Sequence, residues 1–162
     1  MLTMAVGFHG VDDDLYREII LDHYRNPRRK RAVEAADVAV EASNPLCGDE
    51  VTLTLRVRDG NLEDVGFTGR GCSISQASAS MMCEEVAGRS SGEATALGRR
   101  FKEMLMQGIE PEDLDGLGDL EALQGVRQYP VRIKCAVLPW NALLRGLEGT
   151  AAEDDQETHV HE

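Results

Sequence analysis

Two runs of alternating apolar and polar residues, separated by a tight turn, constrain the fold of this chain more than any other feature. Residues 51–57 read Val-Thr-Leu-Thr-Leu-Arg-Val, and residues 62–68 follow with Val65 and Phe67 on one face. Between them, Asp59-Gly60-Asn61 supplies residues that tolerate a positive φ angle, as a tight hairpin turn requires. Because a period of two places alternate side chains on one face, the pattern predicts an antiparallel hairpin with one buried face.

Further periodic segments surround this hairpin. A strand is expected over 38–42, and helical spacing of apolar residues predicts helices over 15–25, 72–86, 92–107 and 130–147, with short helical turns at 111–114 and 118–124. Asp12 to Asp14 are suited to open the first helix and Pro130 to open the last. The order of helix, three strands and further helices predicts an α+β fold, with helices packed on one face of a three-stranded antiparallel sheet.

Length, charge and hydropathy limit the function classes. At 162 residues with 42% hydrophobic content, the chain suits one domain, which we place at 12–148, with a flexible N-terminus (1–11) and a disordered acidic tail (149–162). A formal charge of −12 argues against binding to nucleic acid or anionic membrane. No apolar run reaches the roughly 18 residues of a membrane span, and the start lacks an export signal, so we expect a cytoplasmic protein.

Two of the four cysteines stand in a loop and at the start of a helix, and thiols of a reducing compartment often bind metal. Cys47 lies in a turn-rich loop in which Gly48 would let the Cys47 thiol and the Asp49 carboxylate face one point. Cys72 follows two glycines where a helix begins, and helix N-termini stabilise thiolates. We expect the glycines of both loops to let the backbone approach a bound ion.

The third cysteine, Cys135, is flanked by Arg132 and Lys134, whose positive charges favour a thiolate. Cys83 differs, since it stands in mid-helix without glycine, proline or a cation beside it, and we interpret it as a buried, inert thiol. A tetrahedral zinc site accepts thiolates and a carboxylate together. The predicted ligands are Cys47, Asp49, Cys72 and Cys135, and the alternative is that the cysteines are unrelated core residues.

Other candidates have simpler interpretations. His23 lies on or beside the apolar face of the first helix and is interpreted as a packed core histidine rather than a metal ligand. The basic residues between Arg25 and Arg31 are interpreted as a solvated turn, with a docking surface for an acidic partner as the alternative. His159 and His161 belong to the acidic tail, where weak metal binding is the alternative to a solvated segment.

Three motifs carry a resemblance to a known family: Asn44–Asp49, Gly69–Ser75 and Arg132–Ala136. Over about residues 15–147 the chain resembles the SufU branch of the iron-sulfur cluster assembly family that contains IscU and NifU. IscU-type scaffolds carry a histidine directly before the third cysteine, whereas this chain has Lys134. The resemblance implies a SufE/NifU-like fold and a zinc-dependent sulfurtransferase of the SUF system. Such a protein accepts persulfide sulfur from a SufS-type cysteine desulfurase and relays it to the SufBCD complex.

The same resemblance assigns roles to residues. It implies that Cys47, Asp49, Cys72 and Cys135 bind Zn²⁺, that Cys47 is the catalytic residue that accepts sulfur, and that Arg132 contacts the desulfurase. One alternative is an IscU-like scaffold that assembles and transfers a [2Fe-2S] cluster, with iron or the cluster as cofactor on the same residues. The other is a purely structural zinc module in which Cys47 has no kinetic role.

Overall fold

A computed structural model describes residues 2–107 and 117–152 of the chain, with side chains for 14–107 and 117–148. The elements in chain order are α1 (Leu2–Arg25), β1 (Val38–Asn44), β2 (Asp49–Arg58), β3 (Asn61–Arg70), α2 (Ser73–Val86), α3 (Ser91–Gln107), the 3-10 helix η2 (Gly118–Gln128) and α4 (Pro130–Ala152). In the described residues, no helix is both long enough and apolar enough to cross a membrane.

The three strands form one antiparallel sheet in the order β1-β2-β3. Leu53 at its centre pairs with Val40 of β1 and with Phe67 of β3, so the apolar residues of all three strands share one face. The turn between β2 and β3 holds Asp59 and Gly60 at positive φ angles of 54° and 79°. The predicted hairpin and the strand before it are therefore confirmed.

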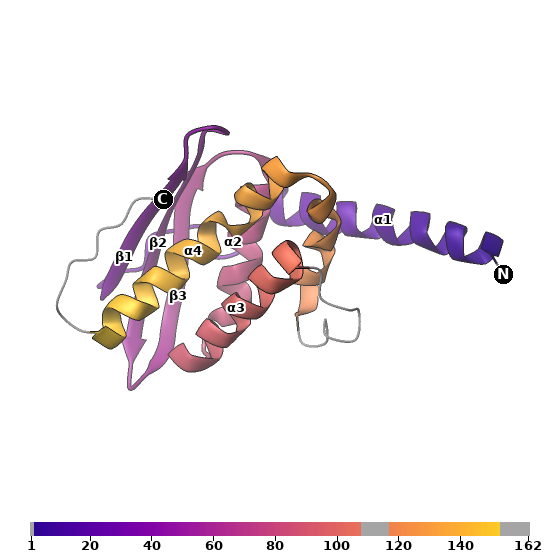
Figure 1. Cartoon of the computed structure of the whole chain (residues 1–162). Helices are drawn as coiled ribbons and strands as arrows, with labels where there is room; N and C mark the ends of the chain where they lie inside the picture. The colour runs from indigo at the N-terminus through magenta and orange to yellow at the C-terminus, as the bar shows by residue number, and fades with distance from the viewer. Residues whose placement is uncertain (1, 108–116, 153–162) are drawn as a thin grey trace.

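Helices cover the apolar face of this sheet (Figure 1). The helices α2 and α4 lie against the strands, while α3 packs on α4 and η2. Beneath them, Leu53, Phe67 and Trp140 are fully buried, and the ring of Phe101 stacks on that of Trp140 with their centroids 4.9 Å apart. This arrangement confirms the predicted α+β fold class.

The link between α1 and β1 crosses the other face of the sheet. The backbone N–H of Val33 donates to the hydroxyl of Thr54 at 2.9 Å, and the N–H of Phe67 donates to the carbonyl of Arg29 at 3.1 Å. Gly66 permits this crossing, since a Cβ there would overlap the carbonyl oxygen of Arg31. The second face is therefore partly covered, whereas we expected a polar face without such a cover.

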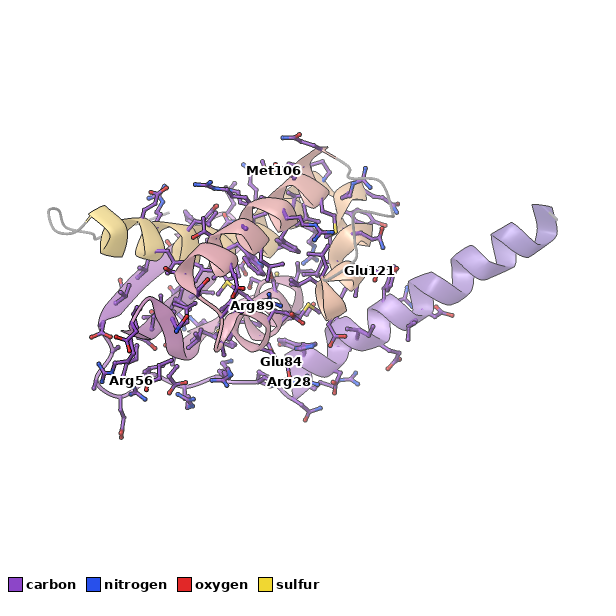
Figure 2. All side chains as sticks on the ribbon, turned by 90° about the horizontal axis from the view of Figure 1, so that it is seen from below. Arg28, Arg56, Glu84, Arg89, Met106 and Glu121 are labelled. Carbon is purple, nitrogen blue, oxygen red and sulfur yellow. The ribbon has the colours of Figure 1, made fainter. Side chains whose placement is uncertain are left out.

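Basic residues of this link pair within the chain. Arg29 and Arg31 each contact the Asp64 carboxylate, at 3.0 and 2.9 Å. Arg28 contacts Asp22 at 2.8 Å and lies beside Glu84 of α2, as Figure 2 shows from below. This pairing agrees with the interpretation of the basic cluster as a surface turn.

Some element boundaries differ from the predicted ones. The helix α1 begins at Leu2 rather than after Asp14 and projects beyond the body (Figure 1). Residues 2–14 contain no proline, and isolated glycines are tolerated inside a helix, so the acidic run does not mark its start. The flexibility of residues 1–11 stays a prediction. At the other end α4 continues to Ala152, past the predicted domain limit.

Two predictions fall partly or wholly outside the described residues. The turn at 111–114 lies there, as does the tail from residue 153 onward, including His159 and His161. The predicted turn at 118–124 is present as the longer 3-10 helix Gly118–Gln128.

Candidate metal centre

The loop between β1 and β2 is a tight turn that presents Cys47. Asn44 and Asp49 face each other as the last pair of the two strands. The Asn44 carbonyl accepts from the N–H of Cys47 at 3.1 Å, and its side-chain oxygen accepts from the N–H of Leu46 at 3.2 Å. Gly48 closes the turn at a φ of 71°. The side-chain amide of Asn44 lies 3.7 Å from the Cys47 sulfur. Both residues belong to the Asn44–Asp49 motif, but we did not predict this contact.

Asp49 is fully buried at the start of β2, and its carboxylate faces the loop that follows β3. One oxygen accepts from the backbone N–H of Cys72 at 2.8 Å. A Cβ at Gly71 would overlap that same oxygen, and a Cβ at Gly69 would overlap the carbonyl of Glu50. These two glycines therefore make room for the neighbouring strand and for Asp49, a packing role that we did not expect of them. That they also let the backbone approach a bound ion stays a prediction.

Cys72 is the N-cap residue of α2, as its place after β3 led us to expect. Its sulfur accepts from the N–H of Ser75 at 3.5 Å, which satisfies one of the free donors of the first helical turn. The same sulfur lies 3.8 Å from the second oxygen of Asp49. The cysteine is thus fixed by its own helix and by the carboxylate.

Cys135 lies in the second turn of α4 and is fully buried. Its sulfur is 3.5 Å from the Cys47 sulfur and 3.6 Å from the carbonyl oxygen of Val131. Burial raises the pKa of the Cys135 thiol, and the neighbouring Asp49 carboxylate and Cys47 sulfur raise it further. Burial and these neighbours thus favour the protonated form of the Cys135 thiol.

The ligand atoms of Cys47, Asp49 and Cys135 all lie within 4.8 Å of one another. Cys72 is outside this trio, but its sulfur reaches the Asp49 carboxylate. Tetrahedral zinc with bonds of about 2.3 Å to sulfur spaces two sulfur ligands about 3.8 Å apart. The Cys47 and Cys135 sulfurs, 3.5 Å apart, come close to that spacing. The Cys72 sulfur lies 3.8 Å from an Asp49 oxygen, and zinc would hold such a sulfur–oxygen pair about 3.5 Å apart. The residues can thus hold a zinc ion with small adjustments.

The remaining cysteine and the described histidine lie in other surroundings. Cys83 is fully buried in α2, and burial raises the pKa of its thiol, which agrees with its interpretation as inert. His23 is fully buried, with its ring nitrogens 2.8 Å from the Ser80 hydroxyl and 2.9 Å from the Asp119 carboxylate. Since both nitrogens have partners within the protein, His23 is a core histidine that links α1 to α2 and η2.

The surface around the centre is apolar and basic. Leu46, next to Cys47, is 81% exposed, and Val131, one turn before Cys135, is 60% exposed. Arg132 and Lys134 are exposed, and no described residue forms an ion pair with either. Arg132 also lines a groove of about 570 Å³ between α1, the start of α2, η2 and the start of α4. The cluster thus opens onto a face with the features of a contact surface.

The chain matches the model of a known protein family. Residues 15–136, which include all four predicted ligands, match the NifU-like N-terminal domain. The chain belongs to this family. The family resemblance predicted from the three motifs is therefore confirmed.

Relatives within the family cover most of the chain. The zinc-dependent sulfurtransferase SufU of Bacillus subtilis is 46% identical over 142 residues, which span 88% of this chain and 95% of that protein. The iron-sulfur cluster assembly scaffold protein IscU of Streptococcus pyogenes is 42% identical over 137 residues, 85% of each chain. A crystal structure of an iron-sulfur cluster assembly scaffold protein for the SUF system from Fervidobacterium islandicum superposes with a TM-score of 0.76 at 35% identity. That match covers 80% of this chain and 94% of the other.

Proposed function

We propose that this protein is a zinc-dependent sulfur carrier for iron-sulfur cluster assembly, in which Cys47 accepts the sulfur. The observation that carries the proposal is the convergence of Cys47, Asp49 and Cys135 from two distant motifs, and of these three side chains only that of Cys47 is partly open to solvent. In this proposal Cys72 completes the ligand set. The similarity to the Bacillus subtilis sulfurtransferase over nearly the whole chain supports the choice of zinc.

The ligands would divide into a fixed and a movable part. Zinc, when bound, supplies the positive charge that keeps its cysteine ligands deprotonated. Asp49 and Cys72 are held by the backbone of the α2 N-terminus, and Cys135 by the buried side of α4. Cys47 stands on a four-residue loop whose turn depends on Gly48. Cys47 is therefore the ligand that can leave the site with the least rearrangement.

Sulfur transfer then follows ordinary thiol chemistry. The Cys47 thiolate attacks the terminal sulfur of a persulfide on the partner enzyme, so that Cys47 gains the sulfur and the partner's thiolate is the leaving group. The exposed Leu46 and Val131 and the basic Arg132 would receive the partner. We infer that this partner is a SufS-type cysteine desulfurase, that SufBCD takes the sulfur onward, and that the reaction takes place in the cytoplasm, where these thiols stay reduced.

The test is a desulfurase assay with the full chain and matched variants. Wild-type protein should increase the rate of sulfide formation from cysteine. In Cys47→Ser this increase should be at least about tenfold smaller. Cys83→Ala is the control, because Cys83 is fully buried away from the centre. A Cys47→Ser variant that activates the desulfurase as well as wild type would refute the proposal.

A scaffold function is the second candidate, since the IscU scaffold of Streptococcus pyogenes is 42% identical to the chain. It would place a [2Fe-2S] cluster on the same cysteines. The group of potential ligands around Cys47 in the described residues contains no histidine, and the position before Cys135 is an exposed lysine. Anaerobic reconstitution with iron and sulfide separates the two functions, because only the scaffold should retain a stable, transferable cluster in place of zinc.

A further inference from the structure

The contact between Cys135 and Cys47 suits a reaction between the two sulfurs as well as metal binding. The two sulfurs lie 3.5 Å apart although their residues are 88 positions apart in the sequence. Cys135 is fully buried, whereas Cys47 is partly exposed beside the exposed Leu46. A thiol of another molecule can therefore reach Cys47, while Cys135 can react only with a group that is already inside the centre.

Cys72 is less suited to reach Cys47. Its sulfur caps α2 by accepting from the N–H of Ser75 and is directed toward Asp49 at 3.8 Å. Moving it toward Cys47 would leave that helical N–H without its partner. Cys135, by contrast, already touches the Cys47 sulfur, and it caps no helix terminus: its contact with a backbone group is a long one of 3.6 Å to the Val131 carbonyl.

We propose that Cys135 is a resolving cysteine, which discharges sulfur carried on Cys47 as sulfide and leaves a Cys47–Cys135 disulfide. The inference rests on the proposed function, because it needs a persulfide on Cys47. The Cys135 sulfur attacks the inner sulfur of the Cys47 persulfide, the bond between the two persulfide sulfurs breaks, and hydrosulfide leaves with the proton of the Cys135 thiol. The carried sulfur is reduced to sulfide, and the two cysteines are oxidised to the disulfide.

The product state has two consequences. The disulfide removes two of the four proposed metal ligands, so zinc and the disulfide exclude each other at this centre. A dithiol reductant has to return both cysteines to thiols before the protein can carry sulfur again. The loop that carries Cys47 can supply the movement, because the sulfurs must approach from 3.5 Å to the length of a disulfide bond, about 2.0 Å.

The experiment follows one load of sulfur in the absence of reductant. Full-length protein is loaded anaerobically by a cysteine desulfurase and cysteine, separated from both, and sampled over time for intact mass and free sulfide. Digestion with trypsin in the absence of a reductant then places the cysteines on separate fragments, which stay joined only where a disulfide links them. Cys47 lies in fragment 32–56, Cys72 and Cys83 lie in 71–89, and Cys135 lies in 135–145. We expect about one sulfide released per loaded chain, with fragments 32–56 and 135–145 joined.

Variants and outcomes separate this inference from the proposed function. Cys135→Ser should retain the extra sulfur on Cys47 at least about ten times longer than wild type, whereas Cys83→Ala should behave as wild type. Wild-type protein that gains the extra sulfur but forms no disulfide, or joins fragment 71–89 to 32–56 instead, overturns the resolving role and leaves sulfur transfer intact. If no sulfur is loaded onto Cys47 at all, the proposed function fails first. The fragment map of the wild type decides the question even where Cys135→Ser does not fold.

Discussion

Asp49 sets the geometry of two of the three motifs. Its carboxylate is fully buried, which is costly unless both oxygens have partners. One oxygen takes the Cys72 backbone N–H and the other faces the Cys72 sulfur. The position of Asp49 at the start of β2 thus fixes where α2 begins relative to the Cys47 loop, so a metal would find these ligands already arranged.

Gly71 is the residue whose substitution should damage this arrangement most selectively. In Gly71→Ala the new Cβ would overlap an Asp49 oxygen, and alanine is strained at a φ of 151°. We expect a loss of about 1–3 kcal/mol in the free energy of unfolding and at least about tenfold weaker zinc binding. Urea denaturation of the metal-free protein and competition with a chromogenic chelator measure the two effects.

Gly125→Ala in η2 is the matched control, because nothing lies within 4 Å of a Cβ at that position. It should change the unfolding free energy by about 0.5 kcal/mol or less and leave zinc binding unchanged. Equal effects of the two substitutions would show that crowding of Asp49 is not the cause.

The glycines also show what the sequence could and could not predict at the scale of residues. Asp49 and three of the cysteines were predicted as ligands because thiols in a loop, at a helix start or beside cations favour metal binding in a reducing compartment. The role of Gly69 and Gly71 was not identified, because their close contacts are with the backbone and side chain of β2. Contacts of that kind depend on strand register, which cannot be predicted from a single sequence.

At the scale of elements, the strands and most helices could be predicted because their periodicity follows from burial of one face. The path of residues 26–37 could not, since it depends on polar contacts between distant residues. Asp64 of β3 anchors this path by pairing with both Arg29 and Arg31. The same limit applies to η2, which is held to α1 by the hydrogen bond from the Gln124 side chain to the Tyr16 hydroxyl at 2.8 Å.

Asp64→Asn should make the free energy of unfolding less dependent on pH in the acid range. The hydrogen bond from Arg31 holds the pKa of Asp64 below its ordinary value of 3.8. Because the folded pKa is lower than the unfolded one, the stabilisation is fully present above about pH 4 and is lost as the pH falls through the folded pKa. We expect Asp64→Asn to cost about 1 kcal/mol at pH 7 and close to nothing near pH 2.

Urea denaturation of wild type and variant at both pH values measures this difference. Glu103→Gln is the control, since Glu103 is exposed on α3 and forms no ion pair with a described residue. A cost of Asp64→Asn that persists unchanged at low pH would mean that packing, and not the ion pairs, explains the stabilisation.

At the scale of the whole molecule, the candidate centre lies at the edge of the core and is not part of it. The apolar core joins the sheet to α2, α3 and α4 through large side chains such as Leu53, Phe101 and Trp140, and this cluster of the described residues includes none of the four predicted metal ligands. Burial of these side chains stabilises the fold at about 1.5–3 kcal/mol each. The fold should therefore persist without metal.

Metal removal distinguishes this view from that of a structural zinc module. A ligand that binds only the folded state stabilises it by about 4 kcal/mol at a free concentration of 1,000 times its Kd. We expect chelation to lower the thermal midpoint while the metal-free protein keeps its far-UV circular dichroism and unfolds in one cooperative transition. Calorimetry of the zinc-loaded and chelated protein, with the Cys47→Ser variant beside them, measures this directly. Loss of the cooperative transition on chelation would assign zinc a structural role. A retained transition with a lowered midpoint would mean that the fold does not depend on zinc, so that Cys47 can leave the metal for sulfur chemistry without unfolding the protein.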